Sequence, residues 1–309
     1  MNKPILFLIF NRLDTTQKTF EQIRIAQPPK LYLASDGPRE SKAGEKEAVE
    51  LVRNWVLENI DWECEVKTLF RTENLSCKYA VSDALNWFFE QEPDGIVLED
   101  DCVPSQSFFE YCEELLDHYK EDKRIWHVSG QNPLGVWDCK GASYYFAQDE
   151  LCWGWATWAD RWQAFDINMP DFEENMLNIK EVMPNLYTYS YWDDKFSKCK
   201  TNEINSWAYI WTYTIMKEHG LCINPHKNLV TNIGFEGVHF KDSERNTQLN
   251  CKRYNIDKIV HPKAIGLDYK ARRQANKKYL KLNRLKDVMH YAKIHLLFPF
   301  KKDFWALLR

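Results

Sequence analysis

The first hundred residues alternate short apolar segments with helical patterns, and this alternation restricts the possible folds more than any other feature. The apolar segments span residues 4–10, 30–34, 65–71 and 94–98. Residues 4–10 form a continuous apolar run, which is typical of a strand covered on both faces. Because strands that alternate with helices build parallel sheets, we predict an α/β fold with a mixed, mostly parallel sheet and helices on both faces.

Helices are predicted for residues 15–26, 43–59, 78–91, 108–119 and 206–219, and Gly220 is predicted to cap the last one. Two further strands are predicted at residues 124–129 and 142–147. Residues 149–211 are rich in aromatic side chains, and we expect them to be less regular. A tryptophan is more often a core residue than a sugar-binding face, so core packing is our first interpretation of this stretch.

Polar side chains follow the predicted strands at the points where the strands end. Arg12 follows the first strand, Asp36 the second, and Glu99, Asp100 and Asp101 the fourth. Ligands of open α/β sheets collect at the carboxyl ends of the strands, so we expect these residues to converge on one edge.

Three consecutive carboxylates repel one another, and a divalent cation is one way to keep them together. Mg²⁺ or Mn²⁺ prefers such oxygen ligands and often binds substrate phosphates as well. A solvated acidic surface is the alternative for the triplet. Asp36 could bind a nucleobase or ribose, or form its own turn bond, and Arg12 could bind phosphate or a surface acid. Together these residues predict a pocket with base, phosphate and metal ends.

Composition excludes other classes. With 41 basic and 45 acidic residues the formal net charge is -4, which gives no basic surface for nucleic acid. The nine cysteines contain no CxxC pair and indicate a reducing compartment. We find neither a signal peptide nor the run of about 20 apolar residues that a membrane span requires. We therefore expect a cytoplasmic protein, whose basic tail from Tyr269 either contacts the inner membrane face or packs on the domain.

The chain resembles the GT-A nucleotide-sugar transferases, in particular N-acetylglucosaminyltransferase I and related bacterial proteins. The segments that carry the resemblance are residues 11–12 and 35–36, residues 96–105 and 108–111, residues 125–132 and 152–156, and residues 234–239. The resemblance implies a GT-A domain over residues 1–240, with a nucleotide-binding half at 1–105 and an acceptor half at 106–240. Residues 241–309 would form an extension.

The resemblance also implies roles for single residues. Arg12 would lie near the donor, Asp36 would recognise uracil, and Asp100 would face the ribose. Residues 153–154, Trp153 and Gly154, would contact the donor sugar and the acceptor.

For the metal, the resemblance makes Asp101 the direct ligand of Mn²⁺ or Mg²⁺, with His239 nearby and Glu99 acting indirectly. Lys78 is a further candidate for donor binding.

An inverting transferase needs a base for the acceptor hydroxyl, and here the sequence departs from the resemblance. The position expected for the family's aspartate holds Ala208. Asp194, in a Trp-Asp-Asp sequence with Asp193, and Glu203 are the candidate bases. Without a base the chain would be a retaining enzyme or a binder of nucleotide-sugars.

We therefore predict a metal-dependent, inverting glycosyltransferase that moves a sugar from a UDP-sugar to a saccharide or lipid-linked acceptor in surface-polysaccharide synthesis. A nucleotidyltransferase is the alternative enzyme, but it would normally show a glycine-rich loop after the first strand, and residues 11–16 contain no glycine. A carbohydrate-binding module is the non-enzymatic alternative, favoured by the 13 tryptophans.

Overall fold

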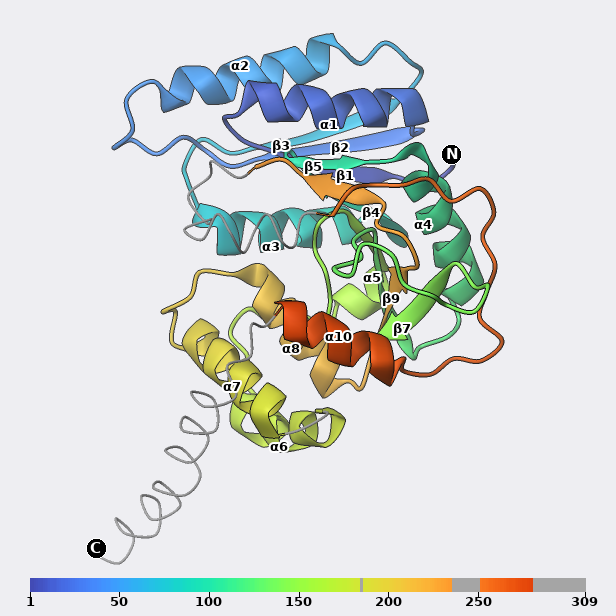
Figure 1. The fold of residues 1–309 in the computed structure, drawn as a ribbon. Coiled ribbons are helices and arrows are strands. Elements are labelled where there is room, and N and C mark those ends of the chain that lie inside the picture. The colour runs from blue at the N-terminus through green and yellow to red at the C-terminus, as the bar shows by residue number, and fades with distance from the viewer. Residues whose placement is uncertain (184–185, 235–250, 280–309) are drawn as a thin grey trace, which may run out of the picture.

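The computed structural model describes residues 1–183, 186–234 and 251–279, and its centre is an eight-stranded sheet (Figure 1). In spatial order the strands are β3 (Glu65–Phe70), β2 (Lys30–Ser35), β1 (Ile5–Ile9), β4 (Asp94–Glu99), β8 (Trp155–Trp158), β6 (Ile125–Ser129), β9 (Leu221–Pro225) and β7 (Tyr144–Ala147). Only β8 and β7 oppose the other six strands. The predicted mixed, mostly parallel sheet is confirmed, whereas β8 and β9 were not predicted.

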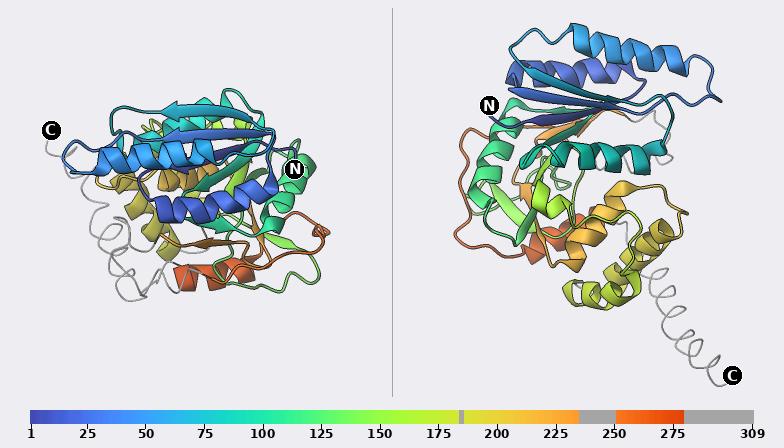
Figure 2. Two further views of the ribbon diagram at one scale, coloured as in Figure 1. Left: turned by 90° about the horizontal axis from the view of Figure 1, so that it is seen from above. Right: turned by 180° about the vertical axis from the view of Figure 1, so that it is seen from behind.

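Helices cover both faces of the sheet, as predicted (Figures 1 and 2). One face carries α1 (Leu13–Ala26), α2 (Glu45–Glu58) and α4 (Gln106–Tyr119), and the other carries α3 (Ser76–Phe89), α5 (Ala159–Trp162) and α8 (Trp207–Lys217). Alternate residues of a strand point to opposite faces, so Ile96 and Leu98 of β4 join the first core while Val97 joins the second. Glu99 continues the alternation toward the α3 side.

A third core lies in the segment that we expected to be irregular, and here the prediction was wrong. Residues 159–217 form α5, α6 (Phe172–Val182), α7 (Leu186–Lys200) and α8. In α7 the buried residues Tyr189, Trp192, Phe196 and Cys199 recur at helical spacing and pack against α6 and α8. The aromatic side chains are thus the apolar faces of packed helices, which confirms the core-packing interpretation.

The end of α8 differs in detail from the predicted glycine cap. His219 adopts the left-handed conformation with φ 53°, and Gly220 donates its backbone N–H to the carbonyl of Ile215 at 2.8 Å. Gly220 is required for a different reason, because a Cβ at this position would lie 2.7 Å from the ring of Trp126.

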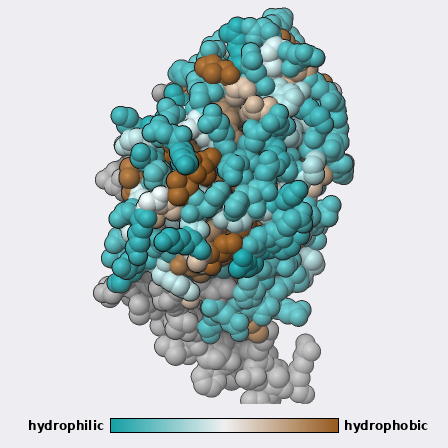
Figure 3. Space-filling view, turned by 90° about the vertical axis from the view of Figure 1, so that its right-hand side faces the viewer, coloured by the Kyte–Doolittle hydropathy of each residue, from teal (hydrophilic) through white to brown (hydrophobic). Residues whose placement is uncertain are grey.

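The described part of the C-terminal extension packs on the sheet. Ala271 of α10 (Tyr269–Tyr279) is buried against Tyr145 and Ala147 of β7, so this part of the basic tail follows the second of its two predicted placements. Figure 3 views the molecule from its α4 side, where hydrophilic residues cover most of the surface and apolar patches are small. None of the described helices combines the length and apolar composition needed to cross a bilayer.

Candidate functional site

The carboxyl ends of β1, β2 and β4 meet at one edge of the sheet, as predicted. Ile9 pairs with Ser35 across the β1–β2 ladder, and Leu8 pairs with Glu99 across the β1–β4 ladder. The parallel registers therefore bring the residues after each strand together, because equivalent strand ends lie side by side.

Arg12 binds two members of the acidic triplet. Its Nη2 atom lies 2.5 Å from Asp100 Oδ1 and 2.7 Å from Asp101 Oδ2. Both carboxylates are buried, whereas a third of the arginine side chain is exposed. Asp100 Oδ2 is buried and has no hydrogen-bond partner within the described residues. The guanidinium thus supplies positive charge to a site that still offers a free carboxylate oxygen.

A second, two-stranded sheet positions Asp101 from its other flank. In this sheet β5 (Cys102–Pro104) pairs antiparallel with β10 (Val230–Asn232), and Asn232 pairs with Cys102. The Asn232 amide donates to Asp101 Oδ1 at 3.0 Å. A Cβ on Gly234 would lie 1.9 Å from Asp101 Oδ2, so only glycine allows the chain to pass this close to the carboxylate.

The acids interact strongly enough to shift their proton affinities. Burial raises the pKa of Glu99, and the charges of Asp101 and Asp100 raise it further. Burial also raises the pKa of Asp100, although Arg12 opposes that shift. Burial alone would lower the pKa of Arg12, but the two aspartates outweigh it and raise the value. A divalent cation would relieve this repulsion, so the residues fit the predicted Mn²⁺ or Mg²⁺.

Asp36 lies at the same edge but is already bonded to the backbone. Its Oδ1 accepts from Gly37 N and Leu75 N, both at 2.9 Å, and its Oδ2 accepts from Ser76 N at 3.1 Å. These bonds hold the start of α3, and they include the local turn bond foreseen as the alternative for Asp36. Burial raises the pKa of the half-buried Cys77 thiol, and the charges of Glu99 and Asp36 raise it further. A carboxylate offers about four acceptor sites, of which these bonds to Asp36 use three, so its Oδ2 retains capacity for a base or ribose.

Lys78 is directed elsewhere. Its ammonium lies 2.8 Å from Asn202 Oδ1 and 3.3 Å from the carbonyl of Cys199, and only 3% of the residue is exposed. Burial lowers its pKa. These contacts join α3 to the end of α7, so the structure gives Lys78 a positioning role, and its donor contact stays a prediction.

Residues 153–154 lie beside the end of β4, and the donor contact that the resemblance implies for them stays a prediction. Gly154 has φ 66°, and a Cβ there would lie 2.8 Å from Val230 and 3.2 Å from Leu98. Its carbonyl accepts from Gly130 N at 2.7 Å. Trp153 is half-buried against the first core. The glycine therefore lets the loop close over the end of β4, next to Glu99.

The candidate bases lie on helix α7 and in the turn after it. Asp194 forms ion pairs with Lys198 at 2.7 Å and with Lys195 at 3.2 Å. Glu203 is exposed and accepts from the Thr201 hydroxyl at 2.8 Å. Within the described residues, neither carboxylate forms a hydrogen bond or ion pair with the acidic edge. His239 lies outside the described residues.

Glu150 is a functional candidate that the sequence analysis missed. Its Oε1 accepts from the Thr212 hydroxyl at 3.0 Å, and its buried Oε2 has no hydrogen-bond partner within the described residues. Burial raises its pKa to about 8. Its negative charge also raises the pKa of Glu99, so Glu150 acts on the acidic edge electrostatically.

Glu150 contacts α8 close to Ala208, the position where the resemblance places an aspartate. Thr212, the partner of Glu150, is one helical turn after Ala208 and donates to the Ala208 carbonyl at 3.1 Å. The side chain of Glu150 therefore reaches the same part of α8 from the loop before β8. No local pattern around Glu150 signals this, because the contact joins residues 62 positions apart.

Searches with the sequence found neither a matching family model nor a matching curated protein. Solved structures give three comparable similarities. UDP-glucose pyrophosphorylase in complex with UDP-glucose has 11% identity and a TM-score of 0.39, covering 80% of this chain and 99% of that one. A putative glucose-1-phosphate thymidylyltransferase from Bacillus anthracis has 9% identity and a TM-score of 0.40. The similarity covers 76% of this chain and 90% of that one. Mouse xyloside xylosyltransferase 1 has 10% identity and a TM-score of 0.33, covering 70% and 81%. At these scores, the function proposed below rests on the geometry of this chain alone.

Proposed function

We propose that this chain is a metal-dependent glycosyltransferase that moves a sugar from a nucleotide-sugar, a UDP-sugar in our proposal, to an acceptor hydroxyl. The observation that supports it is the contact of Arg12 with the buried carboxylates of Asp100 and Asp101 at the carboxyl edge of the sheet. Such an edge is where open α/β folds bind their ligands.

Asp101 and Asp100 would hold Mn²⁺ or Mg²⁺, with Glu99 stabilising the pair indirectly. The free Oδ2 of Asp100 is a buried acceptor that the protein itself does not satisfy. When bound, the ion offsets the charge that develops on the departing diphosphate. Arg12 then becomes free to bind phosphate, for which its planar guanidinium is well suited.

The remaining donor contacts would come from neighbouring residues on the same edge. Asp36 retains acceptor capacity for the base or ribose, while backbone bonds fix its orientation. Trp153 and Gly154 form the loop next to Glu99 and would adjoin the sugar. His239 stays a proposed metal neighbour.

For an inverting reaction, we propose Glu150 as the base in place of Asp194 and Glu203. Asp194 is neutralised by two lysines, and Glu203 is exposed and bonded locally. Glu150 instead combines burial, a fixed orientation and an oxygen that has no protein partner. A pKa of about 8 makes its carboxylate a competent proton acceptor near neutral pH.

Two features of the chain bear on the alternatives. In the structure α1 begins at Leu13, directly after Arg12, so no glycine-rich phosphate loop separates β1 from α1. This favours sugar transfer over nucleotidyl transfer. The tryptophans Trp155, Trp162, Trp207 and Trp211 are buried in the core and offer no sugar-binding face. The carbohydrate-binding module therefore loses the feature that favoured it.

The test begins with binding. Thermal unfolding of the full chain is measured with UDP, with UDP-sugars and with Mn²⁺, separately and together. Because a ligand that binds the native state raises apparent stability, we expect a shift with UDP that requires Mn²⁺. No shift with any nucleotide or nucleotide-sugar in the presence of metal would refute the proposal.

Products then identify the reaction. A UDP-sugar that binds is incubated with Mn²⁺ and candidate acceptors, and release of UDP is measured. In a parallel reaction the chain receives UTP and a sugar 1-phosphate. UDP from the first mixture supports the glycosyltransferase, whereas pyrophosphate from the second would instead assign a nucleotidyltransferase.

A further inference from the structure

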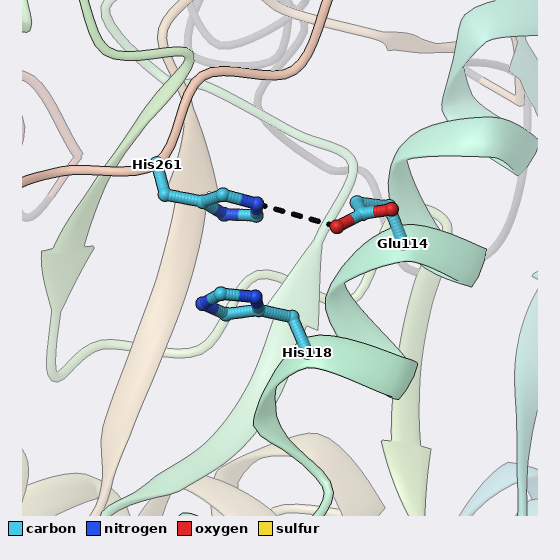
Figure 4. Close-up of side chains that lie close together, drawn as sticks. All are labelled: Glu114, His118 and His261. Carbon is cyan, nitrogen blue, oxygen red and sulfur yellow. Dashed lines mark ion pairs between the residues drawn. The ribbon is translucent and has the colours of Figure 1, made fainter.

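A second group of potential metal ligands lies away from the acidic edge, on the outer side of α4. Glu114 and His118 are one helical turn apart on α4, and His261 comes from the segment 251–268 (Figure 4). One ligand atom from each residue can be chosen so that all three lie within 4.8 Å of one another. Residues four apart on a helix share a face, so the sequence of α4 itself provides two ligands side by side.

The side chains are already arranged around a common point. His261 Nε2 lies 3.2 Å from Glu114 Oε1. The rings of His118 and His261 stack with centroids 3.8 Å apart and an interplanar angle of 8°. Figure 4 shows the two rings one above the other, with the Glu114 carboxylate on the side that His261 Nε2 faces. The nitrogen lone pairs lie in the planes of these parallel rings, so the rings must tilt for one nitrogen of each, together with a carboxylate oxygen, to contact a single ion.

Buried tyrosines hold the second nitrogen of His261. Its Nδ1 lies 2.8 Å from the Tyr144 hydroxyl, which in turn lies 2.7 Å from the Tyr119 hydroxyl. If Nδ1 carries the proton and donates to Tyr144, the Nε2 lone pair faces Glu114 and is available to a metal. Metal-binding histidines are commonly oriented by such a hydrogen bond to their other nitrogen.

We propose that Glu114, His118 and His261 form a second metal site that binds Zn²⁺ or a similar transition-metal ion. Two imidazoles and one carboxylate suit Zn²⁺ and Co²⁺, whereas the all-oxygen acidic edge suits Mn²⁺ and Mg²⁺. The partial exposure of the group leaves room for water as a further ligand. This site is independent of the proposed transferase reaction.

The ion would fasten the segment 251–268 to α4. Hydrogen bonds already attach that segment to the rest of the domain. The Ser143 N–H donates to the Val260 carbonyl at 2.8 Å, and the Val260 N–H donates to Ser143 Oγ at 2.9 Å. Its Ile256 N–H donates to Ser107 Oγ at 2.9 Å. A metal bridge next to these bonds would add a strong link between parts of the chain that are far apart in sequence.

The experiment uses the full chain after chelator treatment, with Asp101→Asn as the background so that the acidic edge does not bind the probe. Co²⁺ and Zn²⁺ are titrated, and both the absorption spectrum and the thermal unfolding temperature are followed. We expect one Co²⁺ per chain, d–d bands without thiolate charge-transfer absorption, and an unfolding temperature several degrees higher. The spectrum separates this site from binding by the nine free cysteines.

His118→Ala should weaken Co²⁺ binding at least tenfold, and His261→Gln should do the same while keeping a polar side chain near Tyr144. The matched control is His219→Asn, because His219 is exposed at the end of α8 and asparagine tolerates its left-handed backbone. Unchanged Co²⁺ affinity in both histidine variants, or no stoichiometric binding by the parent, would overturn the proposal.

Discussion

The two halves of the large sheet neutralise their buried acids in different ways. In the parallel half, β3-β2-β1-β4, the carboxylates of Asp100 and Asp101 face the guanidinium of Arg12. In the mixed half, β8-β6-β9-β7, Glu150 has the neutral hydroxyl of Thr212 as its partner. Burial raises the pKa of Asp100 and of Glu150; the charge of Arg12 opposes the shift at Asp100, whereas at Glu150 only the hydrogen bond from the neutral Thr212 hydroxyl does so. Under the proposed function, the parallel half would hold diphosphate and metal, and Glu150 would accept the proton.

Asp101→Asn should have the largest effect, because it removes a charged ligand from the parallel half. We expect metal-dependent UDP binding to disappear and transfer to fall by roughly a thousandfold or more, which corresponds to several kcal/mol of lost stabilisation. Binding is measured by calorimetry with and without Mn²⁺. Asp194→Asn is the control, since among the described residues Asp194 forms its ion pairs with Lys195 and Lys198 of α7. Equal Mn²⁺-dependent binding by parent and Asp101→Asn would contradict the assigned ligand.

Glu150→Gln should affect the mixed half alone. We expect transfer to fall by about a hundredfold, the low end of what a positioned base contributes, while donor affinity stays at the parental value. In the parent, kcat/KM should rise with pH toward about 8 as the Glu150 carboxylate forms. The pH profile of the variant should lack this rise. A parental turnover rate in Glu150→Gln would contradict the base role of Glu150 but not the proposed donor site.

The unfolding free energy of the protein should also depend on the ionisation of the Glu150 carboxyl group. The pKa of Glu150 is raised from 4.5 to about 8 in the folded state, so folding favours its protonated form. Its stabilising contribution is full below about pH 4.5 and is lost as the pH rises to about 8. Relative to Glu150→Gln, the parent should lose about 3 kcal/mol of unfolding free energy between pH 5 and pH 8.

Urea denaturation of parent and variant at several pH values measures this difference. The charge of Glu150 also raises the pKa of Glu99, Cys152 and Cys222, so the difference between the two curves reports Glu150 together with its coupling to these groups. A difference that does not change with pH would show that the group is ionised throughout.

The loop where the two halves meet provides the smallest expected effect. Gly154→Ala introduces a Cβ 2.8 Å from Val230 at a positive φ of 66°, so overpacking and backbone strain add. We expect a loss of about 2 kcal/mol in unfolding free energy, measured by denaturation. Gly141→Ala is the control, because Gly141 has φ 92° but nothing within 4 Å of a Cβ. If both variants lose the same stability, strain alone accounts for the effect and the close packing contributes nothing.

The sequence predicted the parallel half well and the mixed half poorly, for a physical reason. Strands such as residues 5–9 and 94–99 are continuous apolar runs next to amphipathic helices, and both signals are local. The four residues of β8, Trp155–Trp158, resemble any aromatic stretch, and only pairing with β4 and β6 makes them a strand.

The site shows the same contrast. Arg12 and the acids could be predicted because they follow recognisable strands, and the structure brings them together. Glu150 could not, since its importance depends on burial and on contacts with Thr212 and Glu99 that sequence spacing does not reveal. The Trp-Asp-Asp sequence suggested Asp194 as a base, but in the structure Asp194 forms ion pairs with two lysines.

The pairing of β5 with β10 has a consequence for how this chain can be divided. It ties residues 102–104 to residues 230–232, and Asn232 supplies a hydrogen bond to Asp101 from 131 positions away. A fragment ending before β10 would contain every acidic residue of the edge but would lack the amide that orients Asp101. Exchange of residues 1–105 between related chains, in the laboratory or by gene recombination, should therefore preserve the orientation of Asp101 only when residues 230–234 are exchanged with them.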